Sequence, residues 1–180
     1  MSQANIASSA GSAGRPPVAQ SGEPDHIQQY LTFVLSGEVF AIGILVIKEI
    51  MEYANITAVP MTPAYVRGVI NLRGAVVPVL DLSVRFGKPA SEVTKRTCIV
   101  IIEVGTGKAR QDIGIVVDAV HAVLDIPATD IEPAPRFGMH VHTDFVQGMG
   151  KVDGKFVILL DVNQVLAPEE AAALAQVSES

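Results

Sequence analysis

The sequence predicts a mainly β protein in which one β unit occurs twice and forms two small, closed or half-closed barrels, with a few short helices beside them. Residues 66–82 recur as residues 146–162 without a gap, keeping glycines, buried aliphatic residues and an aspartate near the end in register. Hydrophobic residues make up 49% of the 180 residues but aromatic residues only 5%, and the abundant valine and isoleucine favour strands. Short apolar runs alternate with turn residues at regular spacing, as expected for small barrels.

The duplication extends upstream, where residues 41–44 correspond to residues 114–117. Single positions further along also match, namely Ile47 with Val120, Ile50 with Val123 and Pro60 with Pro133. The second copy carries an insertion around residues 136–142, which we expect to be an exposed loop. The copies differ at the central turn, which reads Asn71-Leu72-Arg73 in the first and Lys151-Val152-Asp153 in the second. A difference between otherwise similar scaffolds indicates a functional position.

The first elements follow from local patterns. Residues 28–35 alternate as a strand, residues 36–38 form a turn, and residues 39–44 return as the partner strand. The spacing of the next residues predicts about one helical turn. This turn would be formed by Ile44, Ile47, Lys48 and Met51.

A second hairpin is predicted at residues 68–72 and 76–80. Pro78 indicates that the latter is an edge strand, because proline has no N–H to donate to a neighbouring strand. Asp153-Gly154 has the composition of a type I′ turn at the corresponding hairpin of the second copy.

The remaining elements complete the chain. Asp81 is placed to cap a short helix over residues 82–86, and residues 97–104 and 112–117 form a third hairpin. Pro168 and the helix formers after it predict a C-terminal helix.

These elements predict three parts of the chain. Residues 1–26 are rich in small and polar residues and are expected to be a disordered tail. Residues 27–170 would form the folded domain with two interleaved barrel subdomains, and residues 171–180 the end of the helix and a tail.

The composition excludes some classes of protein. The net charge of −6 and the scattered lysines and arginines argue against a nucleic-acid-binding module. No apolar run approaches the length needed to cross a bilayer, and the N-terminus lacks a signal-peptide pattern, so we expect no direct membrane insertion. The single cysteine, Cys98, gives no disulfide framework, lies in an apolar run where burial is expected, and is compatible with a cytosolic protein.

No catalytic motif stands out. Asp81, Asp118 and Asp161 each follow an aliphatic run, which favours helix caps and turns over a metal or acid–base site. His140 and His142 could form half of a metal site or lie in a solvated loop. Phosphate-loop and nucleophile motifs are missing from the sequence. We therefore expect no enzyme, no cofactor and no bound metal, with a small metal-binding or hydrolytic protein as the remaining alternative.

Two charged residues are not explained by folding alone. Arg73 and Glu49 could be an ordinary turn residue and a solvated charge, since isolated surface charges usually are. Alternatively, Ile47 and Ile50 expose an apolar patch that Glu49 and Arg73 frame as a pair, which would make a partner site with arginine as its anchor. The divergence of the two turns favours the partner site.

At these residues the sequence resembles the CheW family of bacterial chemotaxis adaptors. The most specific segment is Arg67-Gly68-Val69-Ile70-Asn71-Leu72-Arg73-Gly74. Further segments of the resemblance are residues 40–42, 47–50, 79–82, 114–120 and 131–135. The resemblance covers about residues 28–170 and implies a CheW-like domain of two five-stranded, SH3-like β-barrel subdomains with a hydrophobic groove between them.

The resemblance also implies a function. It indicates a non-enzymatic, cytoplasmic adaptor that couples the cytoplasmic tips of methyl-accepting chemoreceptors to the regulatory domain of the histidine kinase CheA in receptor arrays. The groove would take the receptor tip, and the outer face of a barrel would pair with the kinase. A scaffold of a non-flagellar chemosensory pathway is the alternative. The patterns and the resemblance together predict a partner-binding set of Ile47, Glu49, Ile50, Gly68, Asn71, Leu72, Arg73, Gly114 and Val123. Of this set, the resemblance implies a receptor-facing position for Ile47, Glu49, Gly68, Arg73, Gly114 and Val123, and it leaves the division between receptor and kinase open.

Overall fold

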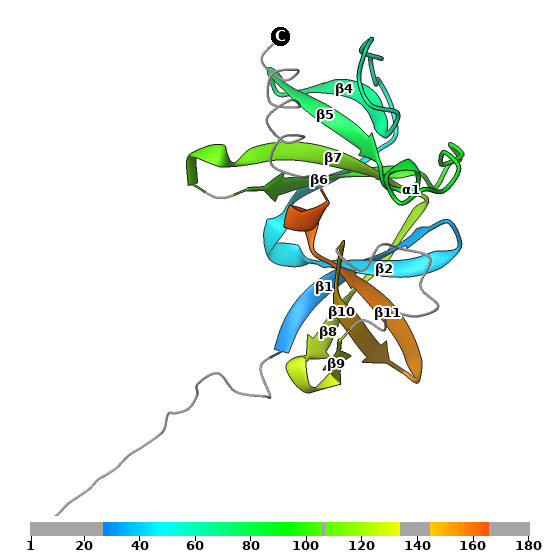
Figure 1. The fold of residues 1–180 in the computed structure, drawn as a ribbon, viewed down its shortest axis with the longest axis vertical. Helices are drawn as coiled ribbons and strands as arrows, with labels where there is room; N and C mark the ends of the chain where they lie inside the picture. Colours follow the sequence, from blue (N-terminus) through cyan, green and yellow to red (C-terminus); the bar gives the residue numbers. More distant parts are fainter. Residues whose placement is uncertain (1–26, 106, 134–144, 166–180) are drawn as a thin grey trace, which may run out of the picture.

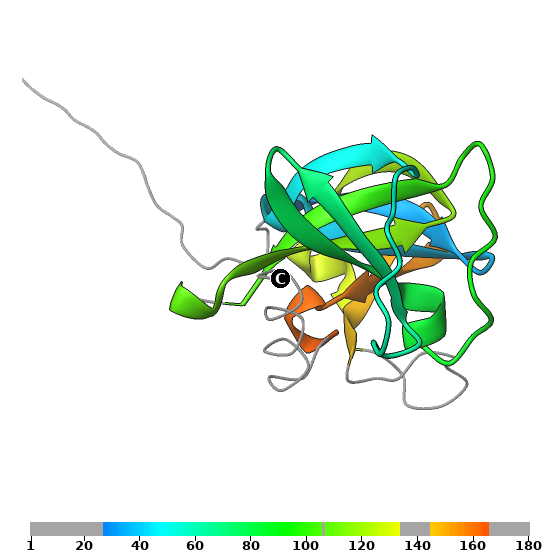
Figure 2. The same cartoon turned by 90° about the horizontal axis from the view of Figure 1, so that it is seen from above.

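The computed structural model describes residues 27–105, 107–133 and 145–165. The predicted disordered tail over residues 1–26, the inserted loop with His140 and His142, and the C-terminal helix lie outside the described residues. Within the described residues the chain is mainly β, and its strands form two sheets that lie one above the other (Figures 1 and 2). The mainly β prediction is confirmed.

The six-stranded sheet takes its strands from both ends of the chain, in the order β8-β1-β2-β11-β10-β9. Its strands are β1 (Ile27–Leu35), β2 (Glu38–Gly43), β8 (Ala119–Pro127), β9 (Ile131–Glu132), β10 (Val146–Val152) and β11 (Lys155–Leu160). The five-stranded sheet has the order β3-β6-β7-β5-β4 and uses the middle of the chain. Its strands are β3 (Ile47–Glu52), β4 (Val66–Leu72), β5 (Ala75–Asp81), β6 (Cys98–Val104) and β7 (Gln111–Val117). Neither strand order closes into a ring over the described residues, so each subdomain is an open sheet.

The duplication is present in the pairing of the strands. The hairpin β4–β5 corresponds to β10–β11, and each has a β-bulge at the same place, between Val66 and Gly68 and between Val146 and Gly148. The parallel pairs also match, since Val79 lies opposite Gly114 in one sheet and Leu159 opposite Ala41 in the other. Each sheet contains strands from both copies, so the two copies exchange their strands rather than forming one sheet each.

Turns and caps repeat as well. Arg73 and Gly74 have φ angles of 53° and 88°, and Asp153 and Gly154 have φ angles of 51° and 79°. Two consecutive positive φ angles are the requirement of a type I′ turn, so the predicted turn after β10 is confirmed.

Asp81 caps the helix α1 (Leu82–Arg85) by accepting a hydrogen bond from the Ser83 backbone N–H. Asp161 does the same for the 3₁₀ helix η7 (Val162–Gln164) through the Asn163 N–H. The preference for helix caps at these two aspartates is therefore confirmed.

Three apolar clusters hold the subdomains together. The largest joins the two sheets, with Phe33 and Phe40 from the six-stranded sheet and Val100, Ile102 and Ile115 from the five-stranded sheet among its buried members. A smaller cluster lies on the other face of each sheet. Where the sheets meet, the described side chains form a core, and the hydrophobic groove between the subdomains stays a prediction.

Two sequence predictions about single elements were wrong. The predicted helical turn after β2 is a 3₁₀ helix, η3 (Ile44–Val46), followed by the edge strand β3, whose residues alternate between half-buried and exposed. Apolar residues in an alternating edge strand gave a spacing that also fits a helix.

Pro78 lies in β5, which is an interior strand rather than an edge strand. Val69, its partner in β4, exchanges both of its backbone hydrogen bonds with Thr57 instead. Val69 and Pro78 therefore form a non-hydrogen-bonded pair, in which β4 needs no N–H from the proline.

Among the described residues, no helix is long and apolar enough to cross a membrane.

Candidate protein-interaction surface

An ion pair joins the two edges of the five-stranded sheet. Glu49 lies on the edge strand β3, and Arg73 lies in the turn after β4, the strand at the other edge. The Arg73 Nη2 atom is 2.8 Å from the Glu49 Oε1 atom, with 74% of the arginine side chain and 28% of the glutamate side chain exposed. The suggested pairing of these two residues is confirmed.

Neighbouring residues fix the turn that carries Arg73. The Asn71 Oδ1 atom accepts a hydrogen bond from the Gly74 backbone N–H at 2.9 Å. Leu72 is half-buried against the smaller cluster of the five-stranded sheet. Asn71 and Arg73 are exposed and Glu49 and Leu72 are half-buried, and we call these four residues the turn surface.

Ile47 and Ile50 do not belong to the turn surface. Glu49 lies opposite Ile101 and so faces the smaller cluster, whereas Ile50 lies opposite Val100 and faces the side of the large core. Ile47 is half-buried against that core, and Ile50 is 44% exposed. The prediction that Glu49 and Arg73 frame an apolar patch of Ile47 and Ile50 was wrong, because Glu49, which pairs with Arg73, lies on the opposite face of β3 from the two isoleucines.

The two glycines of the predicted set are buried. A Cβ atom on Gly68 would collide with the Thr57 carbonyl group, and its φ of +150° disfavours any other residue. A Cβ atom on Gly114 would lie 2.8 Å from the Ile99 Cγ2 atom. Both glycines shape the five-stranded sheet by allowing close packing rather than by presenting a contact surface.

Val123 lies in the other sheet, on the edge strand β8, and is 51% exposed. It corresponds by repeat to Ile50, and both face the side of the large core from an edge strand. Leu45 in η3 is 93% exposed and was missed by sequence reasoning, because its apolar neighbours Ile44 and Val46 are packed against the core and no local pattern distinguishes it.

The three strand-end aspartates have structural partners. Asp81 is buried and bonded to Arg67, and the Asp118 Oδ2 atom accepts a hydrogen bond from the Ser36 N–H at 2.9 Å. In the part of the chain that the structure describes, no three His, Cys, Asp or Glu residues are grouped so as to hold a metal ion.

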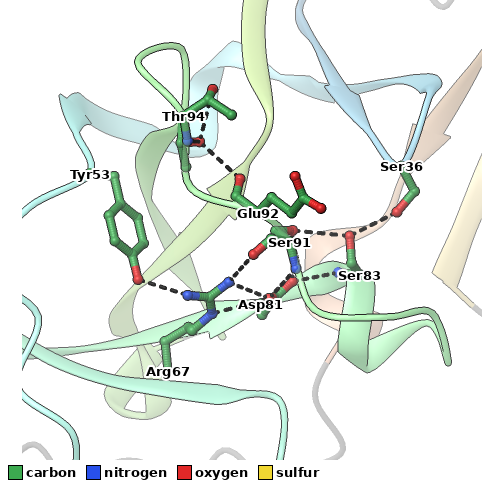
Figure 3. A network of polar contacts seen from close by, with 9 residues as sticks. Ser36, Tyr53, Arg67, Asp81, Ser83, Ser91, Glu92 and Thr94 are labelled. Carbon is green, nitrogen blue, oxygen red and sulfur yellow. Dashed lines mark hydrogen bonds and ion pairs between the residues drawn. The ribbon is translucent and has the colours of Figure 1, made fainter.

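A network of polar contacts, which sequence reasoning missed, surrounds Asp81 (Figure 3). The Arg67 guanidinium contacts Asp81, the Ser91 carbonyl oxygen and the Tyr53 hydroxyl. Arg67 stood within the motif Arg67-Gly68, but nothing in the sequence links it to Ser91 or Tyr53.

Cys98 begins β6 and is half-buried rather than fully buried. Burial raises the pKa of its thiol, and the negative charge of Glu52, its partner across β3 and β6, raises this pKa further. A thiol that is protonated at neutral pH is a weak nucleophile.

Comparisons with known proteins show the family of this chain. The family model of the CheW-like domain matches residues 29–170. This chain belongs to the CheW-like family. CheW-like proteins of this kind are chemotaxis adaptors and scaffolds, so the prediction of an adaptor is confirmed.

Relatives match along most of their length. The chain is 35% identical to the chemotaxis protein CheW of Klebsiella aerogenes over 85% of this chain and 90% of the relative. It is also 35% identical to the chemotaxis protein CheW of Rhizobium meliloti, over 81% of this chain and 92% of the relative. The crystal structure of the scaffolding protein TtCheW from Thermoanaerobacter tengcongensis superimposes with a TM-score of 0.70 at 34% identity, over 78% of this chain and 92% of that one.

Proposed function

We propose that this CheW-like protein couples the cytoplasmic tips of methyl-accepting chemoreceptors to the regulatory domain of the histidine kinase CheA. It would do so by binding alone, without catalysis, in the cytoplasm and within membrane-associated receptor arrays. The observation that carries the proposal is the exposed Glu49–Arg73 pair, in a chain whose family is one of chemotaxis scaffolds. The relatives named above are chemotaxis proteins, which favours this role over a non-flagellar chemosensory pathway.

Two partners need two surfaces, and the chain offers two of different character. The turn surface is polar, with the charged side chains of Glu49 and Arg73 and the exposed amide of Asn71. As the second surface we propose an apolar one that uses Ile50 and Val123, which are exposed on the edge strands β3 and β8 of the two different sheets. An apolar surface suits a helical receptor tip, and an arginine-anchored surface suits a folded domain such as that of the kinase.

The predicted partner-binding set divides between these surfaces and the scaffold. We assign Glu49, Asn71, Leu72 and Arg73 to the polar surface, and Ile50 and Val123 to the apolar surface. Ile47, Gly68 and Gly114 would support binding indirectly through the sheet. The domain boundaries stay as predicted, with residues 27–170 as the binding domain between two tails.

Calorimetry with the purified chain, the CheA regulatory domain and a receptor signalling tip tests this proposal. The wild-type chain should bind both partners, and Arg73→Glu should weaken at least one of them. Asp153→Arg is the matched control, because Asp153 occupies the equivalent turn of the second copy. If the folded wild-type chain binds neither the CheA regulatory domain nor the receptor tip, the proposal is refuted.

A charge swap separates two roles of the pair. The double variant Glu49→Arg with Arg73→Glu rebuilds an ion pair of reversed sign across the same edges. Recovery of binding would mean that the pair acts by shaping the surface. Continued loss would mean that Arg73 itself contacts the partner.

A further inference from the structure

The carboxylate of Asp81 is buried and fully engaged. Its side chain is 1% exposed, and its Oδ2 atom lies 3.0 Å from the Arg67 Nη2 atom. It also accepts hydrogen bonds from the backbone N–H groups of Ser83 and Ser91 and from the Ser91 hydroxyl. A buried charge of this kind is stable only with such partners, so Asp81 holds the guanidinium group of Arg67 in a fixed position.

Arg67 also forms a hydrogen bond to a residue at the other edge of the sheet. Its Nε and Nη2 atoms donate to Asp81, while its Nη1 atom donates to the Tyr53 hydroxyl oxygen at 2.8 Å (Figure 3). Tyr53 directly follows β3, and Arg67 lies on β4. The hydrogen bond therefore connects the two edge strands of the five-stranded sheet.

The same two edges carry Glu49 and Arg73. Through the sheet itself, β3 and β4 are connected only by way of β6, β7 and β5. Direct connections between the two sides include the Glu49–Arg73 pair, the backbone bridge between Thr57 and Val69, and the contacts of Arg67 with the hydroxyl and the ring of Tyr53. The spacing of Glu49 and Arg73 therefore depends on these direct connections.

The second copy shows that folding alone does not require this arrangement. Gln147 stands at the position of Arg67, and Asp161, the counterpart of Asp81, is only half-buried. Asp161 keeps its helix-capping hydrogen bond to the Asn163 N–H. The arginine is thus an addition to the copy that also carries the Glu49–Arg73 pair.

We infer that Arg67 is a positioning residue: through Tyr53 it holds the β3 edge to the β4 edge and so sets the geometry of the Glu49–Arg73 pair. Its effect on binding rests on the proposed function, whereas its effect on the pair does not. Loss of the Tyr53 hydroxyl should loosen the pair without removing any residue of the turn surface. Arg67→Lys should loosen it too, because an ammonium group cannot bond Asp81 and Tyr53 in the same planar geometry.

Nuclear magnetic resonance of the arginine Nε–Hε groups tests the positioning directly. In Tyr53→Phe and Arg67→Lys, the Arg73 signal should move toward its position in Glu49→Gln, where the pair is broken. Asp161→Asn, a change at the equivalent site of the second copy, should leave that signal in place. An Arg73 signal that stays unchanged in both folded variants would overturn the inference.

Calorimetry tests the consequence for binding, using the partner that responds to Arg73→Glu. We expect Tyr53→Phe to lower the affinity of the chain for this partner by about threefold to tenfold, as the loss of one hydrogen bond does. The effect should largely disappear in an Arg73→Ala background, because there is no longer a pair to position. Equal effects in both backgrounds would overturn the positioning role in binding. A shifted Arg73 signal with no response of either partner to Arg73→Glu would instead support the positioning and refute the proposed turn surface.

Discussion

Glu49 and Arg73 stand at opposite edges of one five-stranded sheet and are joined by an ion pair of 2.8 Å. A flat sheet could not bring its first and last strands together, so the pair can form only because the sheet is curved. Exposed ion pairs contribute little to stability. The pair is therefore better explained by the surface that it shapes than by the energy that it adds.

Replacing Arg73 with glycine should separate binding from stability. Arg73 has a φ of 53°, which glycine adopts without strain, and this gain offsets the loss of an exposed ion pair. We expect the free energy of unfolding in urea to change by less than about 1 kcal/mol. Binding measured by calorimetry should fall by about tenfold, the scale of one interface anchor. Asp153→Gly is the control, and an equal loss of binding there would contradict the assignment of the surface to Arg73.

Added side chains at the two bulge glycines should disrupt folding. A Cβ atom at Gly148 would lie 2.9 Å from the Ile131 Cγ2 atom, and one at Gly68 would meet the Thr57 backbone. Gly148→Val and Gly68→Ala should each lower the free energy of unfolding by about 2–4 kcal/mol, through overpacking and, at Gly68, backbone strain. Gly43→Ala should be tolerated, because nothing lies within 4 Å of its added Cβ atom. Thermal unfolding of the three variants checks this order.

The two capping aspartates should differ in their contribution to stability. Asparagine retains the capping hydrogen bond, so Asp161→Asn should cost less than about 1 kcal/mol. Asp81→Asn also removes the charge that faces the partly buried Arg67, and we expect a loss of about 3–5 kcal/mol. Urea denaturation of both variants measures the difference. Equal losses would show that the ion pair of Arg67 and Asp81 adds nothing beyond the cap.

The thiol of Cys98 should react slowly. Burial, and after it the charge of Glu52, raises the pKa of Cys98 above its ordinary value, so the reactive thiolate is scarce at neutral pH. The rate of alkylation by iodoacetamide should therefore rise only at alkaline pH. Glu52→Gln should move the midpoint of this rise to lower pH without abolishing the effect of burial. A midpoint that is the same in both proteins would argue against the influence of Glu52.

Much of the fold could be predicted because its signals are local. The turn after β10 follows from Asp153-Gly154, and the capping of α1 and η7 follows from an aspartate at the end of a strand. The repeat alignment was accurate to the residue, since its pairs Val79 with Leu159 and Gly114 with Ala41 lie at equivalent positions of the two parallel ladders. These features depend on residues that are neighbours in the sequence or on similarity between two segments.

The rest depends on contacts between distant segments. The sequence predicts a helical turn where β3 lies, because the apolar residues of β3 fit both the helical and the strand period, and only the pairing with β6 shows that this segment is a strand. The opposite orientation of Glu49 and Ile50 follows from that pairing as well. Arg67 could not be linked to Tyr53 and Ser91, because three chain segments meet there only in the folded protein.

The exchange of strands between the two copies has a consequence for how the chain folds as it is synthesised. All strands of the five-stranded sheet lie between Ile47 and Val117, so this sheet can form as soon as the middle of the chain has left the ribosome. The hairpin β1–β2 is synthesised before the other described strands, but it must wait for its partners β8 and β11, which follow the whole five-stranded sheet in the sequence. We expect β1 and β2 to be the last of these strands to reach their native pairing, with their apolar face uncovered until β11 has been synthesised.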